Sequence, residues 1–319
     1  MKRWIQGLVL LTLFIYCIWV FLDLLLKNKG TLAALSSHAL TLLPALTGCV
    51  ILLIISVLIR SHRWVLMLNQ PQAYWLSFRS ISIGYLVQCP LSKFGEFARL
   101  GNFKRSNPTP MATLLSTLFL DRFLDTITLM SMIIYCLFTS SALLENHFPQ
   151  FSQLLPKLGI LSLFALIGII VIIFKHEWVE SLLRKQIWIG TIWQEKLTNF
   201  FSKFKAGLSY CKGLNGLSYL LLTSIAIWFL YYLAFLVIIK SYPNLPSDLL
   251  LGDIWLLFCI GTLGSLIPIP GGVAYPLFLQ KGIAAIWPEI SLQDGIVLST
   301  VIYLYNYWAI NIILGGLSI

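Results

Sequence analysis

Charged residues are scarce in this sequence, and acidic residues are the scarcest of them. Only 11% of the 319 residues are charged, whereas 58% are hydrophobic, and Asp plus Glu number 12. A water-soluble globular protein of this size cannot cover its surface with so few charges. The composition therefore excludes a soluble catalytic domain and predicts that lipid surrounds most of the chain.

The motifs of several common activities are also missing. The sequence has no Walker A loop, no HExxH pair and no nucleophile elbow. Its six cysteines form no CxxC pair, and its four histidines lie at the ends of the predicted membrane spans. We therefore expect no catalytic residue, no metal site and no cofactor, and we interpret the cysteines as small buried hydrophobic residues.

The remaining charge is strongly basic, with 22 Lys plus Arg and a net charge of +10. In a membrane protein such an excess reports orientation and contact with anionic lipid rather than nucleic acid. We expect membrane lipids, with anionic headgroups, as partners and no nucleic acid.

Long apolar runs are what the sequence has instead. A helix needs roughly 20 residues to cross about 30 Å of hydrocarbon, and this length predicts an all-α integral membrane protein, a single polytopic domain over 1–319. Basic residues gather in 175–212 and are absent from 140–156, which places both chain termini in the cytoplasm. About six full spans are predicted, at 4–26, 39–60, 111–139, 157–174, 217–240 and 295–318.

Residues 77–105 do not resemble an ordinary span. An apolar arm, Ile81–Leu91, is followed at once by the charged stretch Lys93–Arg99, with helix breaks expected at Pro90 and Gly95. An arm of this length rises only about 16 Å, roughly half of the hydrocarbon thickness. We predict a re-entrant hairpin that enters from the cytoplasmic face.

Residues 251–287 contain two apolar arms around an uncharged junction. Pro268 and Pro270, followed by Gly271 and Gly272, prevent the junction from being helical. Two short spans joined by a tight turn are the alternative, but the lack of charge favours a second re-entrant hairpin, entering from the opposite face.

Residues 187–212 have apolar side chains at helical spacing, interrupted by lysines. This pattern suits a helix that lies flat on the anionic cytoplasmic leaflet, and a cytoplasmic helix packed against the bundle is the alternative.

The span 111–139 carries Asp121, Arg122 and Asp125 about 15 Å from its predicted cytoplasmic end. Ionisable groups at that depth are costly and should pair inside the bundle. Spacings of three and four residues place the three side chains on one side of the helix. Two carboxylates and one guanidinium leave a negative charge that another segment must balance.

The first hairpin can supply that balance through Lys93, Glu96 and Arg99. Our hypothesis is that the three carboxylates hold the three cations when the site is empty, and that the cations bind an anionic lipid headgroup. A guanidinium suits bidentate phosphate recognition. A buried ion-pair network that only fixes helix register is the alternative.

The Gly271–Gly272 junction would also expose backbone amides before a helix, which is a natural anion site. On the last span, Tyr303, Asn306 and Tyr307 lie close together, and hydrogen bonding between helices explains them better than substrate contact.

Three stretches of the sequence, Pro90–Arg99, Asp121–Asp125 and Pro268–Gly272, resemble ordered motifs of the lysylphosphatidylglycerol synthase family, in its flippase-like transmembrane domain. The resemblance covers nearly the whole chain. Pro90 with Gly95-Glu96-x-x-Arg99 resembles the family's Pro and Gly-Glu-x-x-Arg element, and Asp121–Asp125 resembles its acidic-Arg-x-x-Asp element. Pro268–Gly272 is the third carrier. The resemblance implies a bundle with re-entrant helices that moves lipids, such as aminoacylated phosphatidylglycerol, between leaflets of a bacterial or archaeal plasma membrane.

The sequence departs from the family in two respects. Leu277 occupies the position where relatives usually carry Glu, which removes a candidate headgroup contact. The chain also ends at Ile319 without the soluble aminoacyl-transfer domain of the full synthases, so we expect no synthesis of lysyl lipid.

We therefore predict a non-enzymatic lipid flippase or transporter, with a lipid-modifying enzyme as a candidate partner. A membrane-embedded enzyme acting on a lipid-linked group and a non-transporting scaffold for an envelope enzyme are the alternatives.

Overall fold

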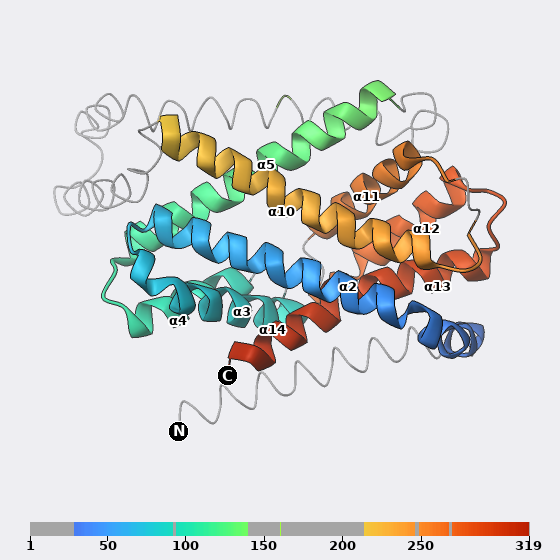
Figure 1. Ribbon diagram of the computed structural model, residues 1–319, viewed down its shortest axis with the longest axis horizontal. Coiled ribbons are helices and arrows are strands. Elements are labelled where there is room, and N and C mark those ends of the chain that lie inside the picture. Colours follow the sequence, from blue (N-terminus) through green and yellow to red (C-terminus); the bar gives the residue numbers. More distant parts are fainter. Residues whose placement is uncertain are drawn as a thin grey trace, which may run out of the picture. The chain divides into compact units, whose positions relative to one another are not determined.

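The computed structural model describes residues 29–91, 94–139, 160, 214–245, 249–267 and 270–318. Every regular element in these ranges is a helix, as the all-α prediction requires (Figure 1). Elements η1 and η3 are 3-10 helices and η4 is a π-helix. In chain order the elements are α2 (Lys29–Met67), η1 (Pro71–Ala73), α3 (Tyr74–Leu91), α4 (Phe94–Ser106), α5 (Met111–Thr139), α10 (Leu214–Ser241), α11 (Leu251–Leu266), η3 (Pro270–Gly272), α12 (Ala274–Ile286), α13 (Leu292–Tyr303), η4 (Leu304–Ala309) and α14 (Ile310–Ser318).

The chain forms two compact units, and their limits fall within continuous helices. Unit 1 comprises 1–58, 78–99 and 228–319, and unit 2 comprises 59–77 and 100–227.

Three helices of the described part are long and apolar enough to cross a membrane. They are Thr41–Met67, Asn215–Ser241 and Leu292–Gly316, at the places predicted for three of the six spans. A multi-pass membrane protein follows from these helices. The predicted spans 4–26 and 157–174, apart from residue 160, and the amphipathic segment 187–212 lie outside the described residues.

Helix α5 has the limits predicted for a fourth span, Met111–Thr139. Its 29 residues are long enough to cross the hydrocarbon, at about 1.5 Å each. Three charges between 121 and 125 interrupt its apolar sequence, which sets it apart from the three helices above.

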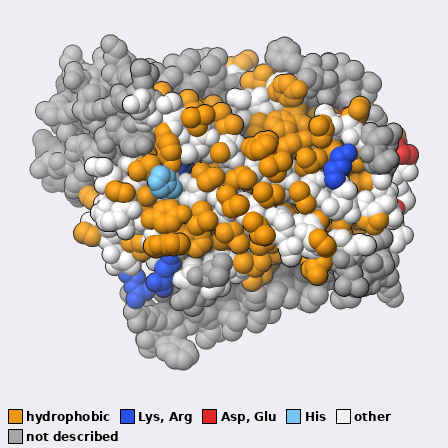
Figure 2. All heavy atoms as spheres, in the orientation of Figure 1, with side chains coloured by type: hydrophobic (Ala, Val, Ile, Leu, Met, Phe, Trp, Pro, Cys, Tyr) orange, Lys and Arg blue, Asp and Glu red, His pale blue; other side chains and the backbone are white. Residues whose placement is uncertain are grey.

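The exposed apolar side chains identify helix faces that can contact lipid. On α10, Leu221, Ile225 and Phe229 follow one another at intervals of four residues, and about half of each side chain is exposed. On α2, Ile51 and Ile55 repeat this spacing. Figure 2 shows hydrophobic side chains over much of one face, with few charges among them.

Helices α3 and α4 form an antiparallel pair through two glycines. A β-carbon on Gly95 would meet the Gly84 carbonyl oxygen and would lie 2.8 Å from the Gln88 β-carbon. One on Gly84 would lie 3.1 Å from the Arg99 β-carbon. Glycine therefore lets the two backbones approach closely, as small residues do between membrane helices.

The helix breaks predicted at Pro90 and Gly95 were wrong in position, because α3 continues through Pro90 to Leu91 and α4, which begins at Phe94, contains Gly95. The helix that contains the predicted apolar arm begins seven residues before it, at Tyr74. Pro90 lies one residue before the end of α3, so it removes a backbone hydrogen bond only from the last turn. The Gln88 carbonyl, one of the last four of the helix, accepts from the Tyr307 hydroxyl.

The second predicted hairpin is an antiparallel pair, α11 and α12 (Figure 1). A β-carbon on Gly264 would lie 2.8 Å from the Ala274 carbonyl oxygen, and one on Gly261 would lie 2.7 Å from Leu279. At the junction, Gly271 and Gly272 have φ angles of 73° and 67°, which favour glycine. The predicted non-helical junction is confirmed at these two residues, whereas Pro268 lies outside the described residues.

In unit 1, Asp294 near the start of α13 makes hydrogen bonds to residues that follow α10. Asp294 accepts hydrogen bonds from the Tyr242 hydroxyl at 3.1 Å and from the Asn244 amide at 2.7 Å. Its backbone N–H bonds Ser291, the residue that caps α13. These contacts tie the end of α10 to the start of α13.

The glycine contact between α3 and α4 predicts the effect of a single methyl group. We expect Gly95→Ala to destabilise the protein by about 1 to 3 kcal/mol, because backbone rather than a flexible side chain must move. Gly101→Ala in the same helix is the matched control, since a β-carbon there meets nothing within 4 Å. Thermal unfolding in detergent measures both, and equal melting temperatures would contradict the close approach.

The Tyr242–Asp294 contact predicts a stability difference that depends on pH. Burial, and then the charge and hydrogen bond of Asp294, raise the pKa of Tyr242. The contact therefore stabilises the folded protein fully below the pKa of an unfolded tyrosine, about 10, and the stabilisation is lost as the pH rises further. At pH 8, Tyr242→Phe should have a lower melting temperature than the parent protein. The difference between the two melting temperatures should narrow above pH 10. A gap that stays constant would contradict this assignment.

Candidate functional site

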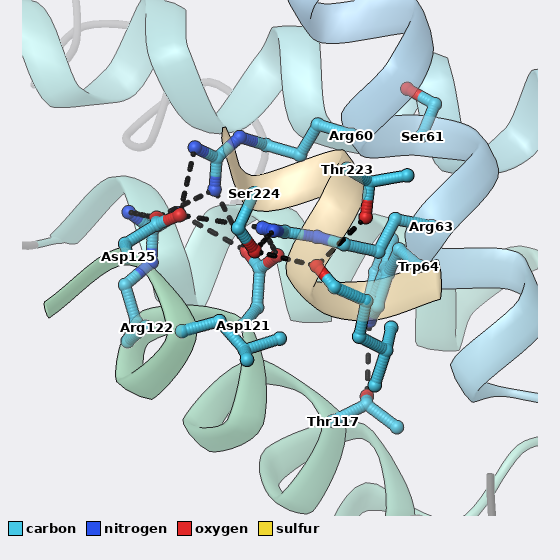
Figure 3. A network of polar contacts seen from close by, with 12 residues as sticks. Arg60, Ser61, Arg63, Trp64, Thr117, Asp121, Arg122, Asp125, Thr223 and Ser224 are labelled. Carbon is cyan, nitrogen blue, oxygen red and sulfur yellow. Dashed lines mark hydrogen bonds and ion pairs between the residues drawn. The ribbon is translucent and has the colours of Figure 1, made fainter. Parts of the chain in front are cut away.

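Five charged side chains of unit 2 form one cluster, which we term the arginine–aspartate cluster (Figure 3). Helix α5 supplies Asp121, Arg122 and Asp125, as the sequence predicted. Helix α2 supplies Arg60 and Arg63, whose spacing of three residues places both on one face.

Arg60 and Arg63 each bridge the two carboxylates. Nη1 of Arg60 lies 3.1 Å from Asp121 and 2.8 Å from Asp125. Nη2 of Arg63 contacts Asp121 closely and lies 3.4 Å from Asp125. Arg60, Arg63 and Asp121 are at most 2% exposed, so these are buried ion pairs.

Polar groups on neighbouring helices hold the cluster in place. Nη1 of Arg63 donates to the Ser224 hydroxyl of α10 at 2.6 Å. One residue beyond Arg63, the indole of Trp64 donates to Thr117 of α5 at 3.0 Å. The cluster thus joins α2, α5 and α10 inside unit 2, and removing one charge would leave its partner buried without compensation.

Arg122 differs from the other two arginines in its exposure. Its guanidinium lies 3.3 Å from Asp125 and 3.5 Å from Asp121, and 42% of its side chain is exposed. Among the residues that the structure describes, three guanidinium groups share the two carboxylates of the cluster.

Arg60 and Arg63 were not among the predicted site residues, because the span that contains Arg60 was predicted to end at residue 60. Helix α2 continues to Met67 and buries both. The Asp residues of α5 make this possible, because an ion pair offsets part of the cost of burial. Two arginines one turn apart at the end of an apolar run were the available signal.

The other predicted charges lie in unit 1, apart from Lys93, which is outside the described residues. Arg99 is 2% exposed, and its Nη1 lies 3.8 Å from the Glu96 carboxylate one turn earlier in α4. Within unit 2, the described ion-pair partners of Asp121 and Asp125 are Arg60 and Arg63 of α2 and Arg122 of α5. The role of Glu96 and Arg99 in headgroup binding stays a prediction.

Two tyrosines surround the Gly271–Gly272 junction in unit 1. The Tyr303 hydroxyl donates to the Gly271 carbonyl oxygen, and the Tyr307 hydroxyl donates to the Gln88 carbonyl at 3.0 Å. Their rings stack with centroids 5.6 Å apart. Hydrogen bonding between helices, the interpretation preferred from the sequence, is confirmed for both. The backbone anion site at Gly271 and Gly272 stays a prediction.

Two further predictions concern cysteines and metals. Cys49, Cys89, Cys136 and Cys259 are buried, as expected, whereas Cys17 and Cys211 lie outside the described residues. Among the residues that the structure describes, no group of three His, Cys, Asp or Glu side chains could hold a metal ion. Leu277, at the position where an acidic residue was expected from the resemblance, is 51% exposed on α12.

The lipid-suited helices and the buried cluster define a multi-pass helical membrane protein with an internal charged site. Residues 4–313 match the family described as the lysylphosphatidylglycerol synthase transmembrane region, and the chain belongs to this family. Neither a curated protein nor a solved structure matches the sequence.

The arginine–aspartate cluster predicts an unequal response to two substitutions in α5. Asp121→Asn should destabilise the protein by about 3 to 5 kcal/mol, because Arg60 and Arg63 stay buried with too little negative charge. Thr126→Ala on the exposed face of the same helix should change stability little. Detergent unfolding curves compare them, and a mild effect of Asp121→Asn would refute the strong pairing.

Proposed function

We propose that this protein moves a lipid between the two leaflets, with the headgroup passing through its charged interior while the acyl chains stay in hydrocarbon. The observation that carries the proposal is the arginine–aspartate cluster, a set of buried charges in a protein whose outer helix faces are apolar. Ionisable groups inside membrane helices are costly and mark substrate pathways or partner contacts. Membership of the family supports a function related to membrane lipids.

In this proposal α3/α4 and α11/α12 are re-entrant hairpins. Helices α4, α11 and α12 have 13, 16 and 13 residues, too few to cross about 30 Å of hydrocarbon alone. Irregular backbone at that depth requires protein or a wet cavity around it, and Tyr303 serves the Gly271 carbonyl in this way. Lys93, Glu96 and Arg99 on one hairpin, and the amides of Gly271 and Gly272 on the other, are the proposed contacts beyond the cluster.

Reconstitution of the full chain into liposomes tests the proposal. Fluorescent phosphatidylglycerol, lysylphosphatidylglycerol and a zwitterionic lipid are placed in one leaflet, and their accessibility from the other side is followed over time. We expect faster exchange of at least one lipid than in protein-free liposomes. Arg99→Gln should slow this exchange about tenfold while the protein remains folded, since a charged contact is lost.

The same assay separates the other functions considered. A chemically altered lipid recovered from the liposomes would identify a membrane-embedded enzyme. Exchange no faster than in protein-free liposomes would reject the proposal in favour of a scaffold. Loss of thermal stability in Arg99→Gln without loss of exchange would assign that residue to structure alone.

A further inference from the structure

Four side chains that combine an aromatic ring with a polar group gather in unit 2. His62 lies near the end of α2, Tyr74 and Trp75 begin α3, and Tyr219 lies near the start of α10. His62 shares a hydrogen bond with the Tyr219 hydroxyl, and the ring centroids of His62 and Tyr74 are 6.3 Å apart. The Trp75 ring lies against Tyr74 with centroids 5.1 Å apart. We term these four residues the aromatic patch.

The aromatic patch lies on the surface of unit 2. Trp75 is 71% exposed, His62 is exposed, and Tyr74 and Tyr219 are partly exposed. Tryptophan and tyrosine are enriched where the hydrocarbon of a bilayer meets its headgroups, because the ring stays in the apolar layer while the N–H or O–H reaches the wet one. The patch therefore has the composition of a membrane-interface surface.

On one side of the aromatic patch the surface is apolar. Leu221, Leu222 and Ile225 follow Tyr219 along α10 and are between 40% and 65% exposed. Tyr219 lies near the start of the 27 residues of α10, Asn215–Ser241, that are long and apolar enough to cross a membrane. The roughly 20 residues that a span needs fit beyond Tyr219. The hydrocarbon layer therefore lies on this side of the patch.

Beyond the aromatic patch, α2 leads into a polar and basic region. Gln70 donates to the Thr109 hydroxyl and accepts from the Asn107 amide, each at 3.0 Å, which joins the turn after α2 to the turn before α5. Lys104 and Arg105 at the end of α4 are exposed, and Lys104 donates to the Thr109 carbonyl at 2.8 Å. Basic side chains here suit the anionic surface of a leaflet. Apolar, aromatic and basic layers thus follow one another in the order found at the edge of a bilayer.

The aromatic patch also indicates the depth of the arginine–aspartate cluster. Arg60 and Arg63 lie within two residues of His62 on α2, which corresponds to about 3 Å along the helix axis. Their ion pairs bring Asp121 of α5 to the same level (Figure 3). If the patch lies at the edge of the bilayer, the cluster lies within about one helical turn of that edge.

Helix α5 is long enough to allow this position. Its 29 residues extend over about 43 Å, whereas the hydrocarbon is about 30 Å thick, so its first turns can lie beyond the hydrocarbon. From Asp121 to Thr139 the helix keeps close to the roughly 20 residues that a span needs. The length of α5 therefore agrees with a hydrocarbon edge near Asp121.

We propose that the aromatic patch lies among the lipid headgroups of one leaflet, and that the arginine–aspartate cluster lies at the same depth rather than at the bilayer centre. The role that follows rests on the proposed function: the cluster receives or releases a headgroup at one leaflet instead of holding it midway. The depth itself does not depend on that function, because it follows from the order of the layers along the helices.

Photocrosslinking tests the depth in the full chain, reconstituted into liposomes of phosphatidylglycerol and phosphatidylcholine. One probe lipid carries an aryl diazirine on its headgroup, and the other carries it at the end of an acyl chain, near the bilayer centre. Mass spectrometry gives the ratio of the two labels at each residue. At Trp75 the headgroup label should exceed the chain-end label at least about fivefold, because the two probe positions lie about 15 Å apart.

Helix α5 supplies a matched pair of sites for the cluster. Phe119 lies two residues before Asp121, and Ser131 lies ten residues after it, which corresponds to about 15 Å or half of the hydrocarbon thickness. Both side chains are exposed. The headgroup label should predominate at Phe119 and the chain-end label at Ser131. A cluster at the bilayer centre would reverse the two labels and would overturn the inference.

The remaining outcomes separate this inference from the proposed function. An excess of chain-end label at Trp75, or no lipid label there while Ile225 is labelled, would overturn the inference even in a protein that moves lipid. Headgroup label at Trp75 and Phe119 in a protein that exchanges no lipid would support the depth and reject the proposed function. The crosslinking needs no substitution, so a variant that fails to fold cannot obscure the result.

Discussion

The ion pairs between α2 and α5 are the interaction on which unit 2 depends. Arg63 and Asp121 are fully buried, so neither can satisfy its charge with water, and each requires the other. The pairing fixes the rotation of both helices, because a turn of either would carry a charge toward apolar surroundings. It also allows α2 to continue as a helix past residue 60 while holding two guanidinium groups inside the protein.

The same constraint explains why Ser224 and Thr117 lie where they do. A guanidinium has five N–H donors, and two carboxylates shared among three arginines do not accept all of them. Ser224 accepts from Arg63, and Thr117 accepts from the neighbouring Trp64. Small hydroxyl side chains thus serve donors at the edge of the cluster without adding charge.

Much of the fold could be predicted from the sequence, because hydrophobic length and helix-breaking residues act locally. The limits of α5 and the junction at Gly271 and Gly272 followed from such patterns. The partners of Asp121 and Asp125 could not be predicted, because pairing depends on which helices are neighbours in space. Basic residues near the end of a span usually mark the cytoplasmic side. For this reason Arg60 and Arg63 were not considered as partners of the two aspartates. The end of α3 was misplaced because a proline marks a helix end only approximately: Pro90 lacks an N–H but still fits into the last turn of α3.

The stacked rings of Tyr303 and Tyr307 have a mechanical consequence for unit 1. One hydroxyl is bonded to the backbone at Gly271 and the other to the backbone at Gln88, so a single rigid stack spans from one interrupted helix pair to the other. Tyr303 is the last residue of α13, and Tyr307 lies within the π-helical turn that begins at Leu304. Displacing the Gly271 backbone relative to the Gln88 backbone therefore strains or breaks one of these two hydrogen bonds, so the two positions are mechanically coupled.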